Sequence, residues 1–174
     1  VLVYSALFAQ SNEDKKTVFQ LSFVPPLSTN GAYSHQYTNT VSLNLLVGIS
    51  KNEEAFTWGG ISNIILNDAK GFQMAGLSNY VGNDGQGVQS AGLANINKNK
   101  FSGFQMAGLA NTASEMTGFQ FAGLVNIAKE VNGLQVAGLV NIAKEVNGVQ
   151  FAGLVNIADK SDCPIGLINI IKNG

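Results

Sequence analysis

The side chains best suited to chemistry in this sequence are carboxamides that return at a nearly constant interval. Two series recur every 15 or 16 residues: Gln73, Gln89, Gln105, Gln120, Gln135 and Gln150, and Asn79, Asn95, Asn111, Asn126, Asn141 and Asn156. A carboxamide both donates and accepts hydrogen bonds. Stacked copies can therefore bond to one another in internal ladders, or they can present a regular polar face to an ordered partner such as a polysaccharide.

The usual catalytic constellations are missing from the sequence. The only histidine, His35, lies in a polar turn ahead of the carboxamide series, so no serine–histidine–aspartate set can be built around it. Glutamates such as Glu115, Glu130 and Glu145 recur at one place in every copy, whereas a carboxylate pair for glycoside hydrolysis should occur once. We therefore expect no enzymatic activity and no cofactor.

Charge and cysteine content exclude further classes of function. The 174 residues include ten basic and eleven acidic side chains, for a net charge of −1, and the basic ones are scattered. Nucleic acid is therefore not an expected partner. The single cysteine, Cys163, rules out a disulfide within the chain, and with one distant histidine it cannot supply the ligands of a structural zinc site. We expect Cys163 to be a small buried side chain.

The carboxamides belong to a repeat that reads Gly-x-Gln-x-Ala-Gly-Leu-x-Asn. Its marker, Gly-Leu-x-Asn, begins at six regularly spaced glycines: Gly76, Gly92, Gly108, Gly123, Gly138 and Gly153. A shortened copy follows at Gly166, and a worn copy precedes the set at Gly60. A fixed period of this length indicates a stacked array in which each copy buries its neighbours.

Each unit is predicted to be β-structure rather than helix. Glycines such as Gly148 and Gly153 recur twice in each unit, and each would cost a helix about 1 kcal/mol relative to alanine. Between them, Val149 and Phe151 alternate with Gln150. Period-2 alternation punctuated by glycine is typical of short strands joined by tight corners. The predicted fold class is therefore all-β.

Two architectures satisfy this pattern. In the preferred β-solenoid, each unit is one coil with three five-residue sides, and each side opens with a glycine or alanine. The marker glycines are then corners, predicted to adopt a backbone conformation that a β-branched residue cannot reach without strain. In the alternative, each unit is an antiparallel β-hairpin, for which Asn147-Gly148 is a strong turn signal, and the hairpins close into a shallow barrel or ring.

The apolar phase of the repeat is expected to form the core. Its aromatic members are Phe72, Phe104, Phe119 and Phe151. Placed outward instead, they would form a lipid belt or a strip for stacking sugars. Trp58 falls at the position of Met74 in the worn copy and is expected to plug the end of the array. The lysines and glutamates of each unit are expected to line a solvated outer turn.

The chain divides into three segments. Residues 1–9 are apolar and precede a sharply polar stretch, which is typical of the back half of a secretory signal peptide, with an ordinary first strand as the alternative. Residues 10–47 lack the repeat, contain strand-like stretches on either side of Pro25-Pro26, and are expected to cap the array. Residues 48–174 are the repeat domain, and we expect it to be truncated at its C-terminal end.

The repeat units, preceded by Val-Pro-Pro-Leu-Ser-Thr-Asn-Gly at 24–31, resemble the surface repeat-containing proteins of Bacteroidetes and spirochaetes. The resemblance covers nearly the whole chain. It implies export to the cell surface or outer membrane of a Gram-negative-type bacterium, or secretion, and it supplies no catalytic or binding residues. A looser resemblance is to the radial hairpin arrangement called a β-flower, which would suit the second architecture.

Repetition without a singular site predicts a non-enzymatic structural or adhesive module that binds through an extended repetitive face. The expected partner is a polysaccharide, an envelope component or a host-surface component, and association with a membrane stays open. The alternative is an integral outer-membrane protein resembling a β-barrel, favoured by the long apolar phase and by a charged fraction of only 12%.

Overall fold

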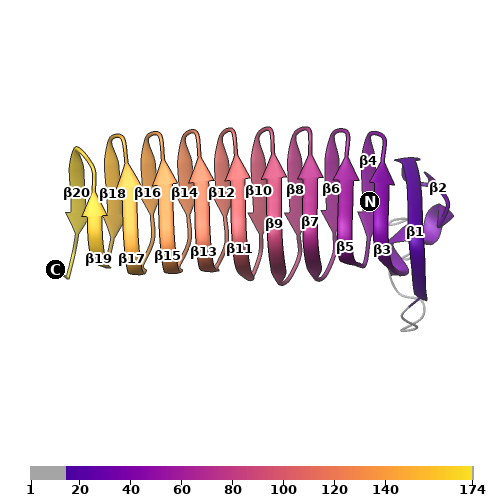
Figure 1. Ribbon diagram of the computed structural model, residues 1–174, viewed down its shortest axis with the longest axis horizontal. Helices are drawn as coiled ribbons and strands as arrows, with labels where there is room; N and C mark the ends of the chain where they lie inside the picture. The colour runs from indigo at the N-terminus through magenta and orange to yellow at the C-terminus, as the bar shows by residue number, and fades with distance from the viewer. Residues whose placement is uncertain (1–14, 174) are drawn as a thin grey trace, which may run out of the picture.

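Successive repeats stack as coils of a β-solenoid in the computed structural model, which describes residues 15–173. Each coil consists of a long strand, a turn, a short strand and a second turn that leads to the next coil (Figure 1). The first turn, at the top of the view, contains the marker glycine and leucine, and we call it the Gly-Leu turn. The second, at the bottom, carries lysine, asparagine or aspartate, and we call it the polar turn.

Within residues 15–173, the long strands form an eleven-stranded sheet, called sheet A, and the short strands form a nine-stranded sheet, called sheet B. Sheet A contains β1 (Lys15–Val24), β2 (Leu27–Ser28), β3 (Tyr37–Asn44), β5 (Asn52–Gly59), β7 (Ala69–Ala75), β9 (Gly85–Ala91), β11 (Lys100–Ala107), β13 (Glu115–Ala122), β15 (Glu130–Ala137), β17 (Glu145–Ala152) and β19 (Lys160–Ile165). Sheet B contains β4 (Val47–Ser50), β6 (Ser62–Ile65), β8 (Ser78–Val81), β10 (Ala94–Asn97), β12 (Ala110–Thr112), β14 (Val125–Ile127), β16 (Val140–Ile142), β18 (Val155–Ala158) and β20 (Ile168–Ile171).

The strands of neighbouring coils pair in parallel and in register with the sequence repeat. In the pairing of β13 with β15, Gln120 lies beside Gln135 and Gly118 beside Gly133. The described antiparallel pairing joins β1 to β2, outside the repeat. The solenoid is therefore confirmed and the ring of antiparallel hairpins is wrong, because Asn147-Gly148 lies inside strand β17 rather than at a turn.

Each coil has two sides and not the three that the sequence suggested. The expected corner at Gly148 lies within the continuous strand β17, where this glycine has a φ of 139°. The equivalent glycines of the preceding coils have φ values from 82° to 140°: Gly71, Gly87, Gly103, Gly118 and Gly133. Residues with a Cβ rarely adopt this region, so the position requires glycine. The long strand continues through this point, and a third side is not formed.

The marker glycines are required for a different reason from the one predicted. Gly138 lies in the Gly-Leu turn, but its φ is outside the left-handed region, so the predicted backbone strain is wrong. A Cβ added at Gly138 would lie 2.1 Å from the carbonyl oxygen of Gly123 in the preceding coil. Turns that stack at the spacing of paired strands leave no room for a side chain between them.

The interior next to the polar turn is filled by two columns whose residue sizes compensate each other. On sheet A, Gly85 is followed in register by Phe101 and then Met116. On sheet B, the coil of Gly85 supplies the larger Asn97, whereas the coil of Phe101 supplies Ala113. Large residues therefore face small ones within each coil, which keeps the two sheets at one spacing along the array.

The segment before the repeat continues the stack and then covers its end. Strand β1 pairs in parallel with β3, and β3 pairs in parallel with β5. Strands β3 and β4 thus already form a coil, which begins ahead of residue 48. Strand β2 and the 3₁₀ helix η1 (Gly31–Gln36) lie with β1 at this end of the molecule (Figure 1). The expected signal-peptide remnant, residues 1–9, lies outside the described residues.

We predict that Gly138→Val destabilises the array far more than Lys144→Ala. Valine at position 138 must push apart two stacked turns, for an expected loss of about 2–4 kcal/mol in the free energy of unfolding. Lys144 is exposed in the polar turn, and its truncation should change stability by about 0.5 kcal/mol or less. Denaturant unfolding of the two variants measures the difference, and equal midpoints would contradict the stacking constraint.

Candidate functional site

The recurring carboxamides point into the solenoid and form two ladders there. All twelve are fully buried. In the glutamine ladder, the Nε2 atom of each glutamine after Gln73 donates to Oε1 of the glutamine in the preceding coil, over 2.6–3.0 Å. In the asparagine ladder, each Nδ2 atom donates to Oδ1 of the asparagine in the following coil, over 2.9–3.0 Å. Because these amides are enclosed, they do not form the polar face for an outside partner that the sequence left open.

Each asparagine also ties the two sheets together. Besides its bond to Asn141, Asn126 donates through Nδ2 to the backbone carbonyl oxygen of Val136 at 2.7 Å. This carbonyl belongs to β15, across the interior from β14. A side chain as short as asparagine spans the interior here, so the two sheets lie close together next to the Gly-Leu turn.

The aromatic residues of the repeat lie outside the solenoid, so their predicted place in the core is wrong. Phe72 is 56% exposed and Phe119 is 37% exposed, and Phe104 and Phe151 fall between these values. The physical reason is the close approach of the sheets that the asparagines bridge, which leaves no space for facing aromatic rings. Alternation placed phenylalanine and glutamine on opposite faces of the strand, but it did not say which face was interior.

Two other expected side-chain positions need the same correction. Trp58 is in register with Met74, as predicted, but it is 39% exposed on the outer face of sheet A and does not plug the end of the array. Cys163 is exposed rather than buried, and it lies in register with Val149 on the same outer face. Both residues therefore join the outward-facing apolar set.

These outward side chains form a continuous surface around the Gly-Leu turns, which we call the apolar band. On sheet A it consists of two columns: Phe56, Phe72, Val88, Phe104, Phe119, Leu134 and Val149, and Trp58, Met74, Ser90, Met106, Phe121, Val136 and Phe151. The turns add Ile61, Leu77, Leu93, Leu109, Leu124, Leu139 and Leu154. Sheet B adds Ile64, Tyr80, Ile96, Thr112, Ile127, Ile142 and Ile157. The band thus covers both faces and the edge between them.

Contacts within the band run along its columns and between them. The rings of Phe104 and Phe119 are stacked with their centroids 4.7 Å apart, and Phe119 and Phe121 are 6.5 Å apart. A shallow hollow of about 350 Å³ opens in one column and is lined by Ser90, Met106, Phe121 and Val136. The band is therefore ordered and nearly continuous along the coils.

Charge is segregated from the apolar band in every coil. The stretch from the first band residue on sheet A to the last on sheet B contains no charged residue, as in 104–112, 119–127 and 134–142. Charged side chains follow the polar turns instead, as Lys100 and Glu115 do. The two ends of each coil thus have opposite arrangements. At the Gly-Leu turn, amides lie inside and apolar side chains outside, whereas at the polar turn apolar side chains lie inside and charged ones outside.

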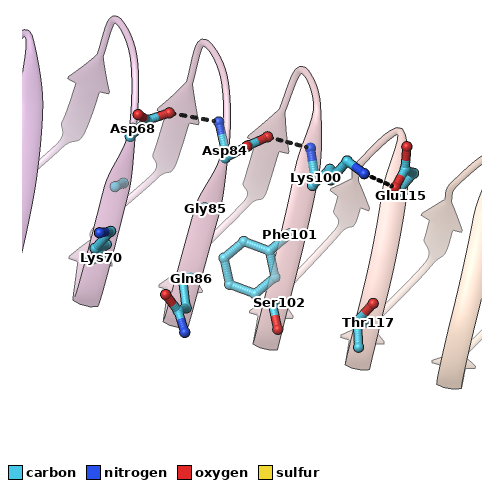
Figure 2. A pocket seen from close by; sticks show the side chains of 11 residues that line it. Asp68, Lys70, Asp84, Gly85, Gln86, Lys100, Phe101, Ser102, Glu115 and Thr117 are labelled. Atoms are coloured by element: carbon cyan, nitrogen blue, oxygen red, sulfur yellow. Dashed lines mark hydrogen bonds and ion pairs between the residues drawn. The ribbon is translucent and has the colours of Figure 1, made fainter.

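The charged half also contains a hollow, of about 430 Å³, shown in Figure 2. Its carboxylates are engaged: Asp68 accepts from the backbone N–H of Asp84 at 3.2 Å, and Asp84 accepts from that of Lys100. Lys100 in turn forms an ion pair of 2.7 Å with Glu115, and this hydrogen-bonded partner raises the pKa of Lys100. Each of these contacts joins two neighbouring coils, so they stabilise the stack.

Comparisons of the chain with protein-family models, with curated proteins and with solved structures found no match. Among residues 15–173, no helix has both the length and the apolar character needed to cross a membrane. In the same range, no three histidine, cysteine, aspartate or glutamate side chains gather where they could hold a metal ion. The apolar band is therefore the surface feature on which a function can be argued.

The carboxyl group of Glu53 is buried, although the repeat pattern predicts a solvated position for the glutamates. Glu53 is 2% exposed, and its Oε1 atom accepts from Asn39 Nδ2 at 2.9 Å and from Ser42 Oγ at 2.7 Å. Burial raises the pKa of Glu53 above its usual range, although these hydrogen bonds oppose the shift. Its position in register with the buried Ala69 is the sequence signal that would have placed it inside.

We predict that Gln120→Leu costs more stability than Gln150→Leu. Leucine at 120 leaves two buried groups without partners, Nε2 of Gln135 and Oε1 of Gln105. Each orphaned group should cost about 1–3 kcal/mol. Gln150 ends the ladder, opposite Pro164, and its loss orphans only Oε1 of Gln135. Denaturant melts should show roughly twice the loss for the inner variant, and equal losses would mean that the ladder bonds contribute little.

We predict that Glu53→Gln removes a decline in stability with rising pH. A raised pKa in the folded state means that the folded chain binds the Glu53 proton more tightly than the unfolded chain. The associated stability is present below the unfolded value of about 4.5 and is lost as pH rises through the folded pKa. Chemical unfolding at pH 4.5 and about pH 8 should show the variant gaining on the parent at the higher pH. Glu54→Gln, at the exposed neighbour, is the matched control, and an equal gain there would refute the assignment.

Proposed function

We propose that this chain is a non-enzymatic module of the bacterial cell surface, or a secreted one, that binds through the apolar band. The observation that supports the proposal is the continuity of the band over consecutive coils with no charged residue inside it. Soluble monomers rarely expose apolar patches larger than a few hundred Å², and larger patches mark interaction sites. The resemblance of the repeat to exported surface proteins supports the location.

The chemistry of the band favours an apolar partner over a polysaccharide. Sugar recognition combines stacking on aromatic rings with polar side chains that bind hydroxyl groups. The carboxamides that would supply those bonds are fully buried here, and Ser62 and Ser78, two of the outward hydroxyl groups, bond to each other at 2.8 Å. The partner is therefore an apolar component of the bacterial envelope or of a host surface.

A repetitive band binds by adding many similar contacts. Each coil presents a comparable set of side chains, so affinity increases with the number of coils engaged at once. This mode differs from that of an enzyme, in which one set of residues must occur once. It explains why the repeat keeps its apolar positions from coil to coil while no single coil carries a distinctive cluster.

We predict that the double variant Phe104→Asp/Phe119→Asp loses more than about tenfold in binding to bacterial envelope fractions or host matrix, because two half-exposed rings no longer contribute. The matched control is Ser102→Asp/Thr117→Asp, which places the same charges on the same strands outside the band. Circular dichroism and thermal melts would show that both variants fold.

Binding of the parent chain to apolar envelope or matrix preparations, with loss in the band variant alone, is the expected result. If the parent chain binds none of these preparations at high micromolar concentration, or if the band and control variants bind equally well, the proposal fails. Should Phe104→Asp/Phe119→Asp unfold the chain, Phe104→Ser/Phe119→Ser repeats the measurement with a smaller perturbation.

A further inference from the structure

We propose that the partner of the apolar band is the hydrocarbon of one leaflet of a lipid bilayer, into which the solenoid inserts edge-on with its long axis in the membrane plane. This inference rests on the proposed function and names its ligand. The molecule would then lie as a blade, with the Gly-Leu turns in lipid and the polar turns in water.

The shape of the band points to a fluid partner. Its apolar residues cover the outer face of sheet A, the turn edge and the outer face of sheet B, as Phe119, Leu124 and Ile127 do in one coil. A rigid protein surface, including a second copy of this chain, can cover one flat face and leaves the other two in water. Lipid chains surround a convex edge on all sides and cover the three surfaces together.

The depth of the band fits within one leaflet. From Phe119 to the end of β13 at Ala122, the long strand advances about 10 Å at roughly 3.3 Å per residue, and the Gly-Leu turn extends beyond it. The hydrocarbon core of a bilayer is about 30 Å thick, so the strand and the turn together stay on one side of its midplane. Thr117 follows at the level of the headgroups, and Glu115 lies farther out, where water can solvate its carboxylate.

The interior of the inserted half meets the demand that lipid imposes on polar groups. Hydrocarbon cannot hydrogen-bond, so the polar groups at that depth need partners within the protein. The strands pair between coils, and both Nδ2 bonds of Asn126 and the Gln120 ladder bonds are made inside the protein. An amide interior beneath an apolar exterior is the arrangement expected where the surrounding solvent is lipid.

The charged half carries both signs, which indicates that insertion is driven by apolar contact rather than by attraction to anionic headgroups. Lysine and glutamate alternate near the polar turns, as at Lys129 and Glu130 or Lys144 and Glu145. Binding to neutral vesicles should therefore be strong, and it should change little with salt, since screening acts on charge and not on apolar burial.

The native probe for the test is Trp58, the one tryptophan of the chain, which lies on the band beside Met74. The intact chain is mixed with phosphatidylcholine vesicles and followed by flotation and by Trp58 emission. We expect co-flotation, a blue shift of Trp58 emission, quenching by brominated acyl chains, and the same binding at low and high salt.

Leu109→Asp/Leu124→Asp, in the Gly-Leu turns that would lie deepest in the lipid, should weaken partitioning more than about tenfold. Thr117→Asp/Asn132→Asp should leave it close to that of the parent chain.

Three results would overturn the inference. One is the absence of flotation by the parent chain; another is equal flotation of the two double variants. The third is sedimentation showing that a dimer hides the band and does not dissociate on vesicles.

If the chain fails to bind protein-free vesicles but still binds envelope preparations through Phe104 and Phe119, the proposed function stands and the partner is a protein. Failure in both assays removes both proposals. Circular dichroism of each variant separates loss of binding from loss of fold.

Discussion

The hydrogen bonds of the recurring asparagines are the constraint on which the rest of the structure depends. One Nδ2 group bonds both to the next asparagine and to a backbone carbonyl of the opposite sheet, as Asn126 does at 3.0 and 2.7 Å. These bonds lie where water cannot replace them, so a lost partner leaves a buried group unsatisfied. They hold the two sheets so close near the Gly-Leu turn that the aromatic side chains on the same strands face outward.

The two ladders complement each other along the solenoid. Glutamine amides donate toward the N-terminal end and asparagine amides toward the C-terminal end, so that their dipoles oppose each other. Polar chains of this kind are favourable in a low-dielectric interior only when their members are satisfied, and here the inner members are. Coils can therefore be added without the amide dipoles of the two ladders accumulating in one direction.

The opposite arrangements of polar and apolar residues at the two ends of each coil explain why the apolar band is exposed. At the polar turn, Phe101, Met116 and Val131 form an ordinary apolar core beneath charged side chains. At the Gly-Leu turn, the amides occupy the interior, and the apolar residues of the alternating pattern have only the exterior left. The exposed band is thus a direct consequence of the amide-filled interior. Both proposals for the binding partner of the band follow from that exposure.

The sequence by itself determined the repeat, its β character, the two alternating phases and the stacking of like residues, because period and glycine placement depend only on local backbone geometry. It also placed Trp58 in register with Met74. Only the tertiary structure decided that the coil has two sides, that the glutamines lie inside and Phe104 outside, and that Glu53 is buried. Alternation assigns the residues of a strand to two faces but does not say which face is interior. The distance between the sheets, set by contacts across the interior, decides which face is buried.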